Sequence, residues 1–400
     1  MTGFDFQRLR RFPDVEAPNL QAWDATDELL VRRAVESGVD GDEIAIIGDE
    51  YGAIALALTD AGMRGIRVHQ DLITGRRALA ANARALDLPL PAAHELDSSL
   101  LAGVRLVLLQ LPKGLAELEE IADAVARWAA PDVTLVAGGR VKHMALTQNE
   151  VLARHFSHVQ PQRAERKSRL IVASGALPVP DQPPFPVSRR HDGFTLSAYG
   201  AAFAGARLDV GTRVLIDVMS TLVPPSPAPA SAPFHPIDTP AGGLRAEFRP
   251  VASPAPLRVV DLGCGTGALA VAFAQQHPDA VITATDRSAS AARSAQATIV
   301  ANGLAARITV TLDDAGSELP DGSADLVLLN PPFHLGTSVH EGAGHRLIQA
   351  AARLLRPGGE VWTVFNSHLD HRGVLTRDVG ATEQVARTPK FTVTRSIRRG

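Results

Sequence analysis

The sequence has almost no cysteine and no long apolar run. A single cysteine, Cys264, occurs among 400 residues, which excludes an intramolecular disulfide framework and a cysteine-based zinc cluster. No run of about 18 apolar residues is present, and the first residues lack the apolar core of a signal peptide. We therefore expect a soluble, cytoplasmic protein without a membrane partner.

The sequence also lacks an excess of positive charge. It contains 40 Lys and Arg residues against 43 Asp and Glu residues, so its formal net charge is −3. Many nucleic-acid-binding proteins carry a basic excess over the whole molecule. A polyanionic partner of this chain must therefore bind to a local basic patch.

The apolar content, by contrast, is enough for two domains. Hydrophobic residues make up 45% of a chain that exceeds the usual size of a single core. From Leu257 onward, β-branched runs alternate with Ala- and Leu-rich stretches, which predicts a parallel sheet covered by helices. Helices are expected over 267–276 and 344–355, with Pro357-Gly358-Gly359 ending the second. The predicted strands are RVVDLG, AVITATD, RITVTL, ADLVLLN and GEVWTVFN.

The first half of the chain repeats this pattern. EIAIIGDEYGAIALAL resembles RVVDLGCGTGALAVAF, and VRLVLLQLPK resembles ADLVLLNPPF. Gly48 corresponds to Gly263 and Asp71 to Asp286 at the same offset. A helix over 115–128 is also expected, because its apolar residues share one face. These correspondences predict a duplicated doubly wound α/β fold.

The two copies differ at the positions where a ligand would bind. In the first copy the glycine-rich turn is Gly-Asp-Glu-Tyr-Gly at 48–52, and Gln-Leu-Pro-Lys at 110–113 replaces Asn-Pro-Pro-Phe. Acidic and bulky side chains prevent the close backbone approach that glycine permits. We infer that the first copy has lost cofactor binding and serves as a scaffold or in substrate recognition.

Two features separate the copies. Asp192-Gly193 lies between two β-like runs and predicts a hairpin. Further on, ten of the 28 prolines fall between Pro224 and Pro256, interleaved with Ala and Ser. Such a composition has little capacity to pack, so we expect a linker here, with binding of a proline-recognising partner as the alternative.

The turn at 261–267 has the features of a cofactor site. Gly263, Gly265 and Gly267 lie between a strand and a helix, where the backbone can approach a ligand closely. Asp286 follows at the end of the next strand and can accept hydrogen bonds from both ribose hydroxyls. Asp261 within the turn favours a ligand with an ammonium group over a pyrophosphate. S-adenosylmethionine satisfies these requirements.

The end of the third strand offers a contact for adenine. Asp314 is positioned to accept a hydrogen bond from the adenine amino group, with its neighbour Asp313 as the alternative. An ordinary acidic surface turn is the competing interpretation of Asp314 by itself.

Asn330-Pro331-Pro332-Phe333 follows a buried strand and is expected at the carboxyl edge of the sheet, where such folds bind ligands. The Asn330 side-chain oxygen and the Pro331 carbonyl can accept the two N–H groups of an exocyclic amine. Phe333 would stack on the base. The alternative is a simple turn at the end of a strand. No metal is expected: His368, Asp370 and His371 are more typical of a solvated loop.

At these motifs the chain resembles the bacterial ribosomal RNA guanine-N2 methyltransferases with tandem methyltransferase-like domains. DLGCGTG and NPPFH are shared across that family, whereas LQLPKGLAELE, LDVGTRVLIDVM and NSHLDHRGVL resemble the large-subunit (23S) type. The resemblance implies two tandem Rossmann-like class I methyltransferase domains, the first degenerate. It also implies that Gly263, Gly265, Gly267 and Asp286 bind the cofactor and that residues 330–333 bind the target base.

Four segments follow from this interpretation. They are a degenerate domain (1–175), a connecting hairpin and helix (176–222), the Pro/Ala-rich insertion (223–256) and a catalytic domain (257–400). The expected activity is methyl transfer from S-adenosylmethionine to guanine N2 in ribosomal RNA, either free or within a ribosomal subunit or assembly intermediate. The alternatives are adenine N6 or glutamine N5 methylation, and a non-catalytic RNA-binding assembly factor.

Overall fold

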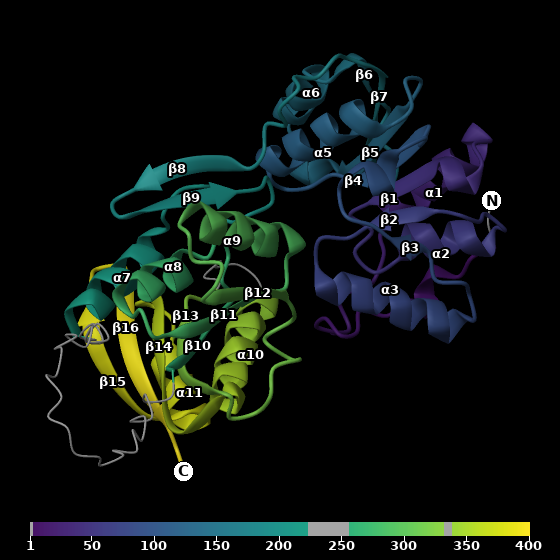
Figure 1. Cartoon of the computed structure of the whole chain (residues 1–400). Helices are drawn as coiled ribbons and strands as arrows, with labels where there is room; N and C mark the ends of the chain where they lie inside the picture. The colour runs from purple at the N-terminus through teal and green to yellow at the C-terminus, as the bar shows by residue number, and fades with distance from the viewer. Residues whose placement is uncertain (1–2, 223–255, 332–337) are drawn as a thin grey trace, which may run out of the picture.

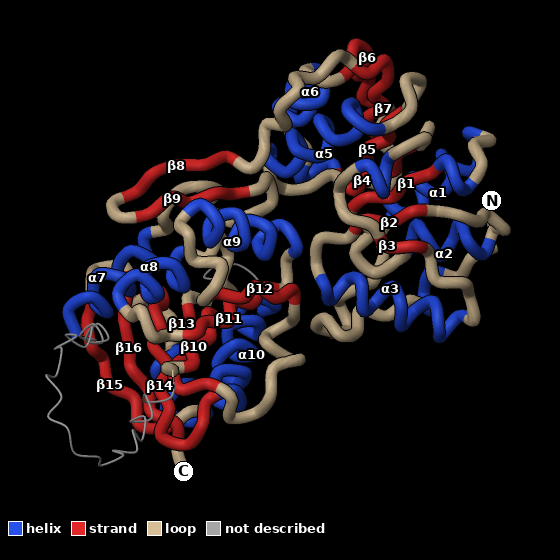
Figure 2. Tube along the Cα trace, in the orientation of Figure 1, coloured by secondary structure: helices blue, strands red, loops and turns tan. Residues whose placement is uncertain are grey.

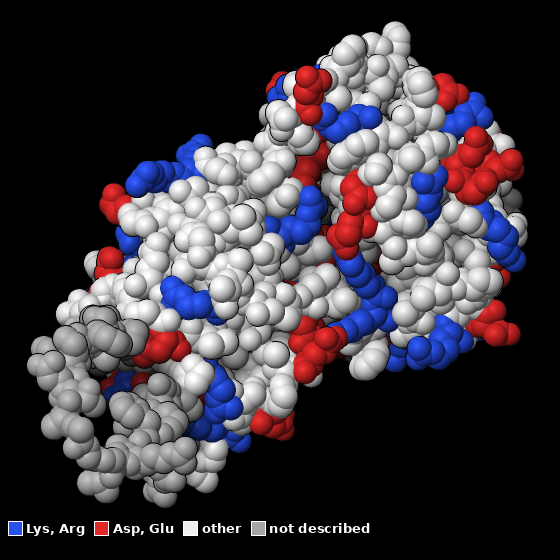
Figure 3. Space-filling model, viewed as in Figure 1, with Lys and Arg blue, Asp and Glu red and all other residues white. Residues whose placement is uncertain are grey.

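The computed structural model describes residues 3–222, 256–331 and 338–400 and contains two seven-stranded sheets (Figure 1). Nearly all of the Pro/Ala-rich insertion lies outside the described residues, as do Pro332 and Phe333. Among the described helices, none has both the length and the hydropathy needed to cross a membrane. On the face seen in Figure 3, Lys and Arg are interspersed with Asp and Glu, in line with the small net charge.

The two sheets have the same strand order. The first is β3-β2-β1-β4-β5-β7-β6 and the second is β12-β11-β10-β13-β14-β16-β15. In both, the first five strands in this order are parallel and the last two pair antiparallel. This common topology confirms the predicted α/β fold and its duplication. The strands are β1 (Ile44–Ile47), β2 (Arg67–His69), β3 (Ala92–Ala93), β4 (Leu106–Gln110), β5 (Thr134–Arg140), β6 (Phe156–Pro161), β7 (Ser168–Ala176), β10 (Arg258–Leu262), β11 (Val281–Asp286), β12 (Ile308–Leu312), β13 (Ala324–Leu329), β14 (Leu355–Asn366), β15 (Gly380–Arg387) and β16 (Phe391–Arg398).

Helices cover both faces of each sheet, as Figure 2 shows. Helix α5 spans the predicted residues and buries Leu118, Ile121 and Val125 along one face, although Leu115 at its start is exposed. Helix α10 ends at Leu354, just before the predicted Pro-Gly-Gly stop. The helices are α1 (Ala25–Ser37), α2 (Ala53–Asp60), α3 (Ile73–Leu86), α4 (Ser98–Leu101), α5 (Leu115–Trp128), α6 (Leu146–Ala153), α7 (Val210–Leu222), α8 (Ala268–Gln276), α9 (Ala289–Ala301), α10 (Ser338–Leu354) and α11 (His371–Asp378), with 3₁₀ turns at Phe6–Arg8, Gly41–Glu43 and Val141–His143.

The connecting segment packs on the second domain. The predicted hairpin is present as β8 (Val187–His191) and β9 (Phe194–Ala198), which lie beside α9 in Figure 1. The backbone N–H of Ser197 donates to Thr298 Oγ1 at 2.9 Å, and Phe194 joins the core of the second domain together with residues of α7. The hairpin and α7 are therefore held by the second domain.

The two domains meet at the start of α3. The Ile73 N–H donates to the carbonyl of Arg287 at 2.9 Å, and the Ala289 N–H donates to the carbonyl of Asp71 at 2.9 Å. The Asp71 carboxylate also accepts from the N–H of Ser290, at the start of α9, at 2.7 Å. These three hydrogen bonds fix the start of α3 in the first domain against the connection between β11 and α9 in the second.

Candidate cofactor and base site

A cavity of about 310 Å³ opens at the carboxyl ends of the second sheet. This position is where open α/β sheets bind their ligands. The predicted residues Gly263, Gly265, Asp286, Asp314, Asn330 and Pro331 all line it, together with Asp313. The structure therefore brings the glycine turn and the start of the Asn-Pro-Pro-Phe motif to one cavity.

The three glycines of the turn have different surroundings. All adopt positive φ, with values of 75° at Gly263, 53° at Gly265 and 76° at Gly267. A Cβ at Gly265 would meet nothing within 4 Å, so the space there is open to a ligand. A Cβ at Gly267 would lie 3.1 Å from the Cβ of Ala295. Gly267 does not line the cavity, and its lack of a side chain allows α8 to approach α9.

Asp286 is held rigidly at the end of β11. Its Oδ2 accepts from the N–H of Gly265 at 2.9 Å, and its Oδ1 accepts from the N–H of Ser288 at 3.0 Å. Burial raises the pKa of Asp286, and these two backbone donors oppose that shift. Because each carboxylate oxygen can accept more than one hydrogen bond, both remain able to bind ribose hydroxyls.

Asp261 lies beneath the turn, outside the cavity wall. Its side chain is 1% exposed, and Oδ2 accepts from the N–H of Ala270 in the first turn of α8 at 3.0 Å. Oδ1 is buried without a hydrogen-bond partner among the described residues. The structure thus places Asp261 as a support of the turn and of α8, whereas the sequence had suggested an ammonium contact.

Burial raises the pKa of Asp261 to about 7, although the Ala270 N–H favours the charged form. Because the folded pKa exceeds the ordinary value of about 4, this group makes the protein less stable as pH rises through that interval. We expect Asp261→Asn to gain stability relative to the wild type between pH 5 and pH 8. Urea unfolding of both proteins at the two pH values measures this difference. An equal difference at both pH values would show that Asp261 does not ionise in this range.

The amide orientation of Asn330 is fixed by α7. Asn330 Nδ2 donates to Thr212 Oγ1 at 2.8 Å and to Asp209 Oδ2 at 3.3 Å. An ionised carboxylate can only accept, so the NH₂ group must face Asp209. This leaves Asn330 Oδ1 buried without a partner among the described residues. An unsatisfied buried acceptor beside a cavity is an expected binding point for a donor.

Sequence reasoning missed Asp209 and Thr212. The Asp209 carboxylate also accepts from the Thr212 N–H at 3.2 Å at the start of α7, a capping arrangement that Asp-x-x-Thr could have suggested. Nothing local connects this helix start with Asn330, however. Phe203 was also missed: its side chain lines the cavity and is 61% exposed.

We expect Thr212→Val to lower kcat about fivefold, because the Asn330 amide loses a net hydrogen-bond contribution of about 1 kcal/mol. Cofactor affinity should remain unchanged, since Thr212 acts through Asn330. Steady-state kinetics and calorimetry with S-adenosylhomocysteine measure the two effects. Thr221→Val, at the exposed end of the same helix, is the matched control. A larger change in affinity than in kcat would contradict this role.

Neither a reactive thiol nor a metal site is found among the described residues. Cys264 lines the cavity, but burial raises the pKa of its thiol, which keeps it protonated. Within the described part of the chain, no group of three His, Cys, Asp or Glu residues is arranged to hold a metal ion.

Comparison with known proteins identifies the family and the fold. Residues 249–395 match the family described as Methyltransferase small domain, and residues 1–176 match the family described as RLMG N-terminal domain. In the solved structures, a T. thermophilus 16S rRNA N2 methyltransferase (RsmC) in complex with AdoMet and guanosine has the same fold. It superposes with a TM-score of 0.72 at 20% identity, covering 98% of this chain and 99% of that chain.

Two curated relatives carry the name Ribosomal RNA large subunit methyltransferase G. The protein of Ectopseudomonas mendocina is 33% identical over 98% of this chain and 97% of its own length. That of Streptomyces coelicolor is 32% identical over the same shares of the two chains. With this identity along nearly the whole of both chains, the protein belongs to the ribosomal RNA large subunit methyltransferase G family.

Proposed function

We propose that this chain transfers a methyl group from S-adenosylmethionine to the exocyclic N2 amine of a guanine in large-subunit ribosomal RNA. The observation that carries this proposal is the unpaired Oδ1 of Asn330, which lies at the same cavity as the glycine turn. We infer the class of RNA from the name of the relatives. We infer an amine as the methyl acceptor from the unpaired oxygen of Asn330.

The cavity fits the proposed cofactor. Gly265 leaves open space at the turn, Asp286 offers two carboxylate oxygens, and the N-terminus of α8 begins directly after Gly267. When bound, S-adenosylmethionine supplies a methyl group that its sulfonium already activates. The protein must therefore position the acceptor and stabilise the charge that develops on it.

The proposed role of residues 330–331 is to orient the amine. Asn330 Oδ1 and the Pro331 carbonyl accept its two N–H groups, which turns the nitrogen lone pair toward the methyl carbon. With the cofactor bound, the N–C bond would form as the S–C bond breaks, S-adenosylhomocysteine would be the leaving group, and the nitrogen would release one proton to water. Both acceptors stabilise the positive charge on nitrogen during the transfer. Phe333, outside the described residues, is proposed to stack on the base.

The first domain is proposed to have no cofactor of its own. Tyr51 of its turn donates to Asp14 at 2.9 Å, and Arg11 lies over the Tyr51 ring at 4.6 Å. Asp71, the counterpart of Asp286, is engaged by α9 of the second domain. Residues from elsewhere in the chain therefore occupy the surroundings of the degenerate turn. We propose that residues 1–175 serve as a scaffold and in recognition of RNA or a ribosomal subunit, in the cytoplasm.

Labelled methyl transfer to each purified ribosomal RNA tests the function. We expect N2-methylguanosine in large-subunit RNA, identified by mass spectrometry of nucleosides. N6-methyladenosine, or label only in protein, would support the alternative acceptors. Absence of S-adenosylmethionine binding in calorimetry would leave the non-catalytic RNA-binding role.

A further inference from the structure

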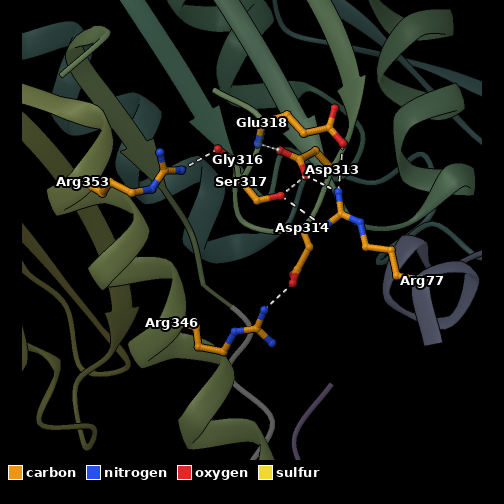
Figure 4. Close-up of polar contacts among 8 residues, drawn as sticks. All are labelled: Arg77, Asp313, Asp314, Gly316, Ser317, Glu318, Arg346 and Arg353. Atoms are coloured by element: carbon orange, nitrogen blue, oxygen red, sulfur yellow. Dashed lines mark hydrogen bonds and ion pairs between the residues drawn. The ribbon is translucent and has the colours of Figure 1, made fainter. Parts of the chain in front are cut away.

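The loop after β12 is held from both domains. Residues 313–323 connect β12 to β13 and carry the two candidate adenine contacts, Asp313 and Asp314. Figure 4 shows Arg77, from α3 of the first domain, reaching into this loop from one side and Arg346 and Arg353, from α10, reaching in from the other. A side chain of the first domain thus contacts Asp313, which lines the cavity.

Arg77 engages three residues of the loop. Its Nη2 donates to Asp313 Oδ1 and to Glu318 Oε1, each at 3.0 Å, and its Nη1 donates to Ser317 Oγ at 3.1 Å. The fork of a guanidinium group fixes such contacts in direction as well as in distance. Arg77 therefore constrains the loop at several points from a single helix position.

The hydrogen bonds of the Asp313 carboxylate all come from protein groups. Besides Arg77, Asp313 Oδ1 accepts from Ser317 Oγ at 2.5 Å, and Oδ2 accepts from the N–H of Glu318 at 2.8 Å. The Asp313 side chain is 2% exposed. Asp313 Oδ1 thus accepts two hydrogen bonds and Oδ2 accepts one, whereas each oxygen of Asp286 accepts one. This fuller occupation and deeper burial leave Asp313 less capacity for a ligand than Asp286 has.

Asp314 has a different set of contacts. Its Oδ2 pairs with Arg346, which leaves Oδ1 to act as the acceptor for a ligand amine. Arg353 steadies the turn that follows, because its Nη2 donates to the carbonyl of Gly316 at 2.6 Å and its Nη1 to that of Leu319 at 2.8 Å. Arg77 therefore binds Asp313 from one side of the loop, and Arg346 binds Asp314 from the other.

We propose that Arg77 of the first domain is a positioning residue for the cofactor: by binding Asp313 and Ser317 it fixes the loop so that Asp314 accepts the adenine amino group. This inference rests on the proposed function, since it assigns part of the S-adenosylmethionine site. It gives the degenerate domain a defined role in cofactor binding, because its Arg77 determines which carboxylate contacts the adenine.

The proposal is tested by the ratio of the affinities for two compounds that differ only in the base, adenine in one and hypoxanthine in the other. S-inosylhomocysteine carries a carbonyl where S-adenosylhomocysteine carries the amine, so a fixed carboxylate acceptor disfavours it. A site built to hydrogen-bond a substrate N–H can reject an analogue that lacks it by as much as about 10⁴–10⁵-fold. A loop released from Arg77 can adjust to either base, and the discrimination should then fall.

Calorimetry on the full-length protein with both compounds tests the proposal. We expect Arg77→Ala to weaken S-adenosylhomocysteine binding about tenfold and to reduce the preference over the inosyl analogue to below about tenfold. The KM for S-adenosylmethionine should rise while kcat at saturation is kept. Arg77→Lys, which retains the charge without the fork, should be intermediate, and it replaces Arg77→Ala as the test variant should the latter fail to fold.

Arg84→Ala, at the exposed end of α3, is the matched control and should retain affinity and discrimination. Unchanged affinity and unchanged discrimination in folded Arg77 variants would overturn this inference and leave the proposed function standing. Failure of the wild type to bind S-adenosylhomocysteine would overturn the proposed function as well.

Discussion

Asn330→Ala is expected to lower kcat by about 10²–10³-fold, the usual effect of removing one group that stabilises developing charge. The affinity for S-adenosylmethionine should change little, because the assigned cofactor contacts come from the glycine turn, Asp286 and Asp314. The variant removes the only side-chain acceptor that we assign to the target amine. It also leaves Asp209 without the Asn330 donor, which is a change outside the cofactor contacts.

Single-turnover methyl transfer and calorimetry with S-adenosylhomocysteine separate the two quantities. Asn149→Ala is the matched control, since the side-chain oxygen of Asn149 is also buried without a partner in the described chain but lies in α6 of the first domain. It should leave turnover unchanged. A comparable loss of turnover and of cofactor affinity in Asn330→Ala would indicate that Asn330 shapes the cofactor pocket instead of binding the base.

Asp286→Ala is expected to weaken cofactor binding by about 100-fold or more. Each hydrogen bond to a charged acceptor contributes about 1.5–3 kcal/mol, and two ribose hydroxyls are involved. The loss extends to the glycine turn, because the N–H of Gly265 loses its acceptor. Asp286→Asn should show a smaller defect, since one acceptor oxygen remains.

A cofactor product without the 2′-hydroxyl distinguishes ribose contact from support of the turn. The wild type should bind the 2′-deoxy analogue of S-adenosylhomocysteine more weakly than the parent compound, whereas Asp286→Ala should bind both alike. Asp279→Ala, an exposed site just before β11, serves as the control. Were Asp286→Ala still to prefer the ribose form as strongly as the wild type, the assignment of Asp286 to the ribose would be wrong.

Local patterns predicted most of the fold. The periodicity of α5, the Asp-Gly turn between β8 and β9 and the repeated strand segments all depend on neighbours in sequence, and the structure contains each of them. The motif residues Gly263, Gly265 and Asp286 reach one cavity for the same reason, because strand-to-helix turns of parallel strands end at one edge of the sheet.

The features that the sequence did not reveal depend on distant residues. Asn330 is oriented by Thr212, 118 positions earlier, and Asp313 is bound by Arg77, 236 positions earlier. Gly267 carries the glycine pattern, yet its surroundings are set by Ala295 on the next helix. Single-sequence patterns contain no information on such pairs, so the sequence left Asp313 and Asp314 as alternatives, and the proposal of Asp314 rests on contacts from distant residues.

The bond between Asp71 and the start of α9 has an evolutionary consequence. A mutant that regained glycine at position 50, the counterpart of Gly265, would still carry the amide of Ser290 where a second ribose would have to bind. Reversion of the ancestral pocket therefore requires that the halves first separate, which also frees the backbone next to Arg287 and Ala289. At this point each half supplies hydrogen-bond partners to the other, so a substitution that restores a ribose site in one half also removes a contact of the other.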